Sequence, residues 1–251
     1  MSRSYSCIAL CLRVKPSGES NREAWFLSGE EGIFRATVFG GPKSRLRSQV
    51  APFHEGMIWI YHDPVKDSRK VTDFDVSVWR PGLREMYERS MAADAIAGTI
   101  LATHAGGGNW KTALELAGDS LDCMEKSGKK PYKRILLHFL WAWTGFLGLR
   151  NELKVCADCA CDVPDNGILW YDPKEGSLYC KNCIGLNHID TEIMLGPGAR
   201  RWLMTTGDMS FTEAQRYNLD YVSFNQAKVF VSGILAEALG RRLPFWDILE
   251  N

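Results

Sequence analysis

The chain has 251 residues, of which 45% are hydrophobic, and it carries 30 basic and 30 acidic side chains. This composition is typical of a globular protein, and the length suits two compact domains. A formal net charge of zero excludes a whole-protein basic field that would attract nucleic acid, so such binding has to come from a local patch.

The first residues carry no apolar core ahead of a small-residue cleavage site, so the sequence predicts no signal peptide. The longest uncharged apolar run, 135–149, is shorter than the roughly 20 residues that cross a bilayer. Eight cysteines without a secretory signal favour reduced thiols and metal binding over disulfides. We therefore expect a cytoplasmic protein with no membrane partner.

Residues 1–80 have the pattern of β-structure. Short stretches of alternating or continuous apolar residues are separated by polar turns with Gly, Pro and Ser. These stretches predict five strands, at 8–14, 24–27, 33–39, 57–61 and 71–79. Five short strands in about eighty residues predict a small barrel of the OB-fold type.

A basic stretch lies within this predicted barrel. Between Gly32 and His54 the chain has no Asp or Glu. Because side chains alternate along a strand, Arg35, Thr37 and Phe39 should share one face. The other cations of the stretch are Lys43, Arg45 and Arg47. Cations beside an exposed ring on a barrel suit single-stranded nucleic acid, while the alternative is a solvated basic loop with Phe39 in the core.

From about residue 81 the pattern becomes helical, and we assign 81–251 to an α-helical domain. Helices are expected at 83–104, 110–125 and 132–149, at a short segment around 200–202, and after the capping boxes that begin at Ser210 and Ser223. The 132–149 helix is apolar nearly all round, so it should lie enclosed at the centre of this domain. Further candidates for nucleic-acid binding cluster at its start: Lys129, Lys130, Lys133 and Arg134.

A metal-binding pattern interrupts the helical domain at about 154–188. It consists of Cys156-Ala-Asp-Cys159, a gap of twenty residues that reads as a hairpin, and Cys180-Lys-Asn-Cys183. Two such pairs predict one structural zinc ion held by four thiolates, with no open position for water. The alternatives are free or disulfide-bonded cysteines, or substitution by Cys161 or His188 as a ligand.

Several catalytic patterns are absent from the sequence. It has no Gly-x-x-x-x-Gly-Lys-Ser/Thr phosphate loop, no His-Glu-x-x-His and no Gly-x-Ser-x-Gly elbow. The five histidines are scattered along the chain. No enzyme class is indicated, although a site of an unrecognised kind stays open.

Three short motifs resemble the bacterial DNA-repair mediator family RecO. The stretch 40–48 with the following Pro52-Phe53 looks like the basic loop of that family, although Gly40 and Gly41 stand where arginines are frequent. The helix end at 146–153 and the stretch 175–180 resemble the segments that lead to the two cysteine pairs.

The resemblance implies a non-enzymatic protein of the cytoplasm, associated with the nucleoid. Such a protein would bind single- and double-stranded DNA and anneal complementary strands. With RecR it would load RecA onto strands coated by single-strand-binding protein. The competing hypothesis is an RNA- or ribosome-associated protein with an OB-fold and a zinc ribbon, which the barrel and the metal pattern fit equally well.

Overall fold

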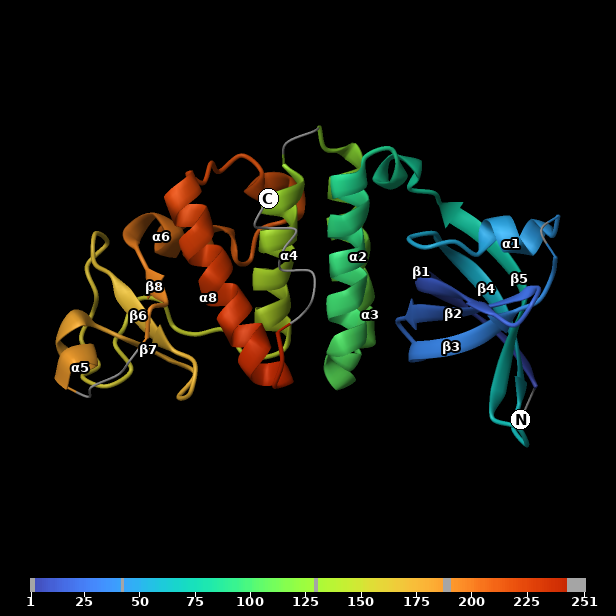
Figure 1. Ribbon diagram of the computed structural model, residues 1–251, viewed down its shortest axis with the longest axis horizontal. Helices are drawn as coiled ribbons and strands as arrows, with labels where there is room; N and C mark the ends of the chain where they lie inside the picture. The colour runs from blue at the N-terminus through green and yellow to red at the C-terminus, as the bar shows by residue number, and fades with distance from the viewer. Residues whose placement is uncertain (1–2, 42, 129–130, 187–190, 243–251) are drawn as a thin grey trace. The chain divides into compact units, whose positions relative to one another are not determined.

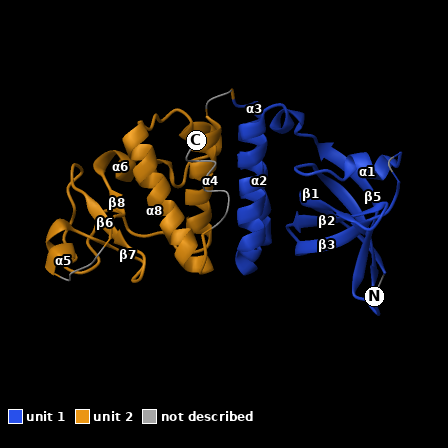
Figure 2. Ribbon diagram, in the orientation of Figure 1, with its two compact units in different colours: residues 1–127 blue, residues 128–251 orange. Residues whose placement is uncertain are grey.

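The computed structural model describes residues 3–41, 43–128, 131–186 and 191–242. The chain divides into two compact units, residues 1–127 and residues 128–251 (Figure 2). Unit 1 contains a β-barrel and the helices that follow it, and unit 2 contains helices and a small sheet (Figure 1).

Five strands of unit 1 form a closed barrel. They are β1 (Ser4–Ser17), β2 (Asn21–Ser28), β3 (Gly32–Val38), β4 (Glu55–Asp63) and β5 (Ser68–Val78). Around the barrel the order is β1-β2-β3-β5-β4, and antiparallel pairing of β4 with β1 closes it. Only β3 and β5 pair in parallel, over a short stretch. The predicted five-stranded OB-like barrel, followed by helices, is confirmed.

Two longer helices of unit 1 contact the barrel at β1 and β2. They are α2 (Tyr87–Ala102) and α3 (Trp110–Lys126), accompanied by the 3-10 turns η1 (Pro81–Arg84) and η2 (His104–Gly107). Trp110 packs on Gly32, where a Cβ would lie 2.6 Å from the indole. The φ of 67° at Gly32 also favours glycine. The strands thus end near the expected boundary at residue 80, while the compact unit continues to residue 127.

The two faces of β1 are covered differently. Cys7, Ala9 and Cys11 belong to the apolar cluster inside the barrel. Leu10 and Leu12 lie on the outer face, yet are fully buried, because α2 and α3 contact β1 there. Ile8, on the same outer face, is 52% exposed. The leucine alternation in the sequence therefore marks the outer face of this strand.

Unit 2 is built around α4, which packs against α7 and α8. Its helices and strands are α4 (Tyr132–Phe146), β6 (Leu169–Asp172), β7 (Ser177–Tyr179), α5 (Lys181–Leu186), β8 (Met194–Leu195), α6 (Pro197–Thr206), α7 (Phe211–Ala214) and α8 (Tyr221–Leu239). The strands form one sheet in the order β7-β6-β8. Trp141 and Trp143 are 1% and 0% exposed, so the expected enclosure of this helix is confirmed. Among the described residues, no helix combines the length and apolar character needed to cross a membrane.

The ends of the last two helices test the capping predictions. Ser210 and Glu213 form the expected capping box at the start of α7. For α8 the prediction was wrong: Asp220 is the N-cap and accepts a hydrogen bond from the backbone N–H of Ser223 at 3.0 Å. The helix therefore begins before Ser223, since an Asp carboxylate is an equally good cap. Gly240 ends α8 in the left-handed conformation, as expected.

His138, on α4, should make the protein sensitive to acid. Its Nε2 donates to the Thr206 carbonyl at 2.8 Å, while Nδ1 is buried without a partner. Burial lowers the pKa of His138 from 6.5 to about 4. Between these values the unfolded chain binds the extra proton, so stability falls as the pH drops, by at most about 1.4 kcal/mol per unit. Urea midpoints measured from pH 7 to pH 4.5 should fall less steeply in His138→Gln, and equal slopes would contradict this assignment.

Candidate nucleic-acid interface and metal site

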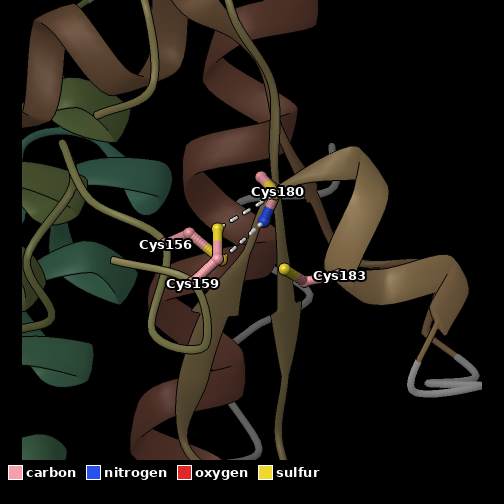
Figure 3. Close-up of side chains that lie close together, drawn as sticks. All are labelled: Cys156, Cys159, Cys180 and Cys183. Atoms are coloured by element: carbon pink, nitrogen blue, oxygen red, sulfur yellow. Dashed lines mark hydrogen bonds between the residues drawn. The ribbon is translucent and has the colours of Figure 1, made fainter. Parts of the chain in front are cut away.

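The four cysteines of the predicted zinc pattern converge at one end of the β6–β7 hairpin. Cys156 and Cys159 precede β6, Cys180 follows β7 directly, and Cys183 lies in α5. Their sulfur atoms all lie within 4.8 Å of one another (Figure 3). The Cys159 and Cys180 sulfurs are 3.9 Å apart, and the Cys180 backbone N–H donates to the Cys156 sulfur at 3.3 Å. Four thiols at these distances can hold a metal ion.

Backbone hydrogen bonds shape the first cysteine turn. The N–H of Ala160 donates to the Cys156 carbonyl at 3.1 Å, and Ala160 has a φ of 53°. The N–H of Ala157 donates to the Leu178 carbonyl at 2.9 Å. This last bond fastens the turn to β7, which leads directly to Cys180. The two cysteine pairs are thus placed together by main-chain geometry.

Backbone N–H groups also favour negative charge on two of the sulfurs. The N–H of Cys161 donates to Cys159 and lowers the pKa of that thiol to about 6. The N–H of Cys183 lowers the pKa of Cys180 in the same way. Hydrogen bonding to Cys159 raises the pKa of Cys183. Thiolates are the metal-binding form of cysteine, so the site is prepared for a cation.

Arg200, on α6, anchors the loop that carries the first cysteine pair. Its side chain is buried and donates to the carbonyls of Leu153, Val163, Pro164 and Gly167 at 2.8–3.1 Å. Burial lowers the pKa of Arg200. The sequence suggested a short helix here but gave no sign of this role, because the partners are carbonyl groups distant in the chain.

Of the alternative ligands, Cys161 lies beside the site and His188 lies outside the described residues. The Cys161 thiol is exposed and hydrogen-bonds to Cys159 and Cys180. It is not among the four cysteines whose sulfurs converge. The four-cysteine set expected from the sequence is therefore the one that the structure assembles.

A second feature lies on the barrel, where cations gather around β3 and the following helix α1 (Arg45–Gln49). We call the following group the basic wall: Arg22, Arg35, Phe39, Lys43, Arg45, Arg47 and Lys70. Phe39 is 46% exposed, which excludes the alternative that places its ring in the core. The ammonium group of Lys70 lies 5.4 Å from the centre of this ring. A cation and an accessible aromatic face thus stand together on the surface.

Hydrogen bonds connect α1 to the start of β2. The Arg47 side chain donates to the Ser20 carbonyl at 3.4 Å, and the Arg22 side chain donates to the Arg47 carbonyl at 3.3 Å. Burial and the neighbouring Arg47 charge lower the pKa of Arg22. The two positive charges therefore act on one another at this part of the barrel surface.

Arg35 differs from the other members of the basic wall. Its guanidinium forms an ion pair with Glu23 on β2 at 3.2 Å, with the Arg35 side chain 64% exposed. The stretch without acidic residues in the sequence is therefore not free of acids in space. Arg22 and Lys70 were missed by the sequence analysis because they lie on other strands, outside that stretch.

Comparison with known proteins connects this barrel to one family. Residues 1–76 match the family model described as "Recombination protein O N terminal". The barrel is similar to the RecO N-terminal domain. The match supports the resemblance drawn from the motif within residues 40–53, and with it a general role in DNA recombination and repair. A comparison with curated proteins found no match.

The barrel also carries a surface with acidic instead of basic side chains. Ile8, Met57 and Trp59 are 52%, 37% and 39% exposed. Asp75 pairs with Met57 and Asp73 with Trp59 in the β4–β5 register, and both aspartates are exposed. These five residues form the acidic wall. The two exposed carboxylates would repel phosphates at this part of the barrel surface.

The candidate cations of the helical domain are less available for binding nucleic acid than those of the basic wall. Lys129 and Lys130 lie outside the described residues. Arg134 donates to the Asn218 side chain at 2.8 Å and to the Gln215 carbonyl at 3.4 Å, so its charge is partly engaged within unit 2. Lys133 is half-buried in the first turn of α4. The basic wall of the barrel is the better supported surface.

Proposed function

We propose that the chain is a non-enzymatic recombination mediator that binds single- and double-stranded DNA through the basic wall. In this proposal it anneals complementary strands and, together with RecR, promotes loading of RecA onto strands coated by single-strand-binding protein. These activities are the ones that the resemblance to the RecO family implies. A cytoplasmic, nucleoid-associated location is part of the same proposal. The observation that carries the proposal is the exposed Phe39 ring among the cations of a RecO barrel.

The basic wall has groups that can bind both the phosphates and the bases of a DNA strand. Lys43 and Arg45 are exposed and can neutralise phosphates, which contribute affinity without regard to sequence. Phe39 offers a ring on which a base can stack, as in sequence-tolerant binding of single strands. Annealing then requires only that two polyanions be screened and held close together.

Annealing of complementary DNA, with and without single-strand-binding protein, tests this function. Phe39→Ala should slow annealing because it removes the stacking surface, at a cost of roughly 1–3 kcal/mol per base in binding. Trp59→Ala is the matched control, since Trp59 is similarly exposed but lies on the acidic wall. Equal effects of the two changes would place binding elsewhere. A preference for structured RNA over complementary DNA would support the RNA-binding alternative instead.

We further propose that the four cysteines hold one structural zinc ion. A set of four thiolates fits tetrahedral zinc, with expected Zn–S distances of about 2.3 Å. Zinc binding would contribute folding free energy to the short β6–β7 hairpin, which has little apolar core of its own. Protein purified without chelators should contain one zinc per chain by elemental analysis, and Cys180→Ser should lower this content. Metal-free wild-type protein would contradict the proposal.

A further inference from the structure

The acidic wall is a continuous face formed by three neighbouring strands. Ile8 lies opposite Met57 in the β1–β4 register, and Met57 lies opposite Asp75 in the β4–β5 register. Trp59, two residues along β4, lies opposite Asp73. Because residues two apart on a strand share a face, three apolar side chains adjoin two carboxylates on the outside of the barrel. The three apolar side chains are 37–52% exposed, so a partner that covered them would gain hydrophobic free energy.

The two carboxylates of the acidic wall are not neutralised within the described part of the chain. No ion pair there includes Asp73 or Asp75. Asp73 accepts one hydrogen bond, from the backbone N–H of Phe74 at 2.9 Å. Both negative charges therefore remain for a partner that brings cations to this face.

A surface of complementary chemistry is present on the same barrel. The basic wall places the exposed Phe39 ring beside the Lys70 ammonium group, with Lys43 and Arg45 also exposed. Each wall thus combines an exposed ring with charges of one sign, and the two signs are opposite. A cation of one wall could also lie over the indole of Trp59 on the other. The formal net charge of zero means that two copies do not repel one another as whole molecules.

We propose that the acidic wall of one molecule binds the basic wall of a second copy of this chain. The contact joins two different surfaces, so each bound pair keeps one free acidic wall and one free basic wall, and further copies can add. Each wall is a small patch of side chains, which makes the association weak and transient. Charge pairing across the contact makes it sensitive to salt.

DNA and a second copy would compete for the basic wall. This part of the inference rests on the proposed function, which assigns DNA to the same side chains. A bound strand covers Phe39 and neutralises the surrounding cations, so the acidic wall of another molecule finds no partner there. Self-association therefore stores the protein with its DNA-binding surface covered, and single-stranded DNA releases it.

Sedimentation velocity of the full-length protein over a range of concentrations tests self-association. At low salt the average sedimentation coefficient should rise with protein concentration and pass beyond that of a dimer. High salt should abolish this rise. An excess of a short oligothymidine should abolish it too, because the basic wall is then occupied, and bound DNA adds only a fixed increment of mass.

A charge exchange between the two walls identifies the surfaces. The first variant is Asp73→Lys with Asp75→Lys, and the second is Lys43→Glu with Arg45→Glu. Each alone brings like charges together and should weaken self-association by about tenfold or more. A mixture of the two should associate again, because every contact between unlike variants then joins opposite charges. Association in the mixture also shows that both variants are folded.

Two further variants serve as controls. Glu175→Lys with Glu237→Lys changes the net charge as much as the first variant, but these exposed residues lie in unit 2, so it should associate as the wild type does. Trp59→Ala leaves the charge unchanged and should still weaken association several-fold, because it removes apolar contact.

A wild-type protein whose sedimentation is independent of concentration at low salt would overturn the proposal. A limiting symmetric dimer would overturn it as well, and so would a mixture of the two charge variants that fails to associate. Monomeric wild type that binds a lysine-rich peptide through Asp73 and Asp75 would assign the acidic wall to a different protein partner. Self-association that persists with oligothymidine bound would refute the DNA site on the basic wall and leave the contact between copies standing.

Discussion

Arg80→Met is expected to destabilise unit 1 by about 3 kcal/mol, because it removes one partner from a buried ionic network. The Arg80 side chain is 2% exposed and contacts Glu55 on β4 at 2.9 Å and Asp122 on α3 at 2.6 Å. It also donates to the Phe53 carbonyl at 2.8 Å. The variant leaves two carboxylates and a carbonyl without their cation. Urea titration of the full chain, followed by hydrogen exchange in peptides from α3, measures the effect.

Two further variants distinguish the effect of burying an ion pair from the effect of leaving a charge uncompensated, both measured as changes in stability. Arg35→Met breaks the ion pair with Glu23, but Arg35 is 64% exposed, so the loss should stay below about 1 kcal/mol. Adding Glu55→Gln to Arg80→Met should recover part of the stability, because it removes one uncompensated charge. If Arg80→Met retained the wild-type midpoint, the network would contribute nothing to joining the barrel and α3.

The cluster of four cysteines could be predicted because its constraint is local. The two residues between the thiols of each pair fix a turn, and four thiols at this spacing are typical of a metal-binding cluster. The positions of four residues were therefore enough to predict the cluster. The barrel could be predicted for a similar reason, since short strands separated by turn residues leave few architectures. Both features depend on short local patterns, namely the two-residue spacing within each cysteine pair and the turns between successive strands.

What the sequence could not show depends on contacts between distant segments. The pairing of Arg35 with Glu23 results from the β2–β3 register, and the burial of Leu10 results from helices that begin about eighty residues later. Arg200 gives no sequence signal, because it binds main-chain carbonyls that any residue supplies. Patterns of residue type identify elements, while the pairing of charges is decided by how those elements pack.

The salt dependence of DNA binding should change most when Lys43, Arg45 and Arg47 are replaced together by glutamine. If each contacts one phosphate of a single strand, the slope of log affinity against log salt should become less negative by about two, at roughly 0.7 per contact. From these three contacts, a fourfold increase in salt would weaken wild-type binding about 20-fold. Arg35→Gln should change the slope by less than one contact, because Glu23 already neutralises Arg35.

A charge-matched control distinguishes a local patch from net charge. Lys66, Lys111 and Lys126 are exposed and lie outside the basic wall, so replacing these three with glutamine changes the net charge equally. Because the chain has no net charge to provide a general field, this control should retain the wild-type slope. Fluorescence anisotropy with a labelled single strand over a range of salt concentrations measures both variants. Equal slopes for the two would mean that the basic wall is not where DNA binds, and Lys133 with its neighbours on α4 would become the surface to examine.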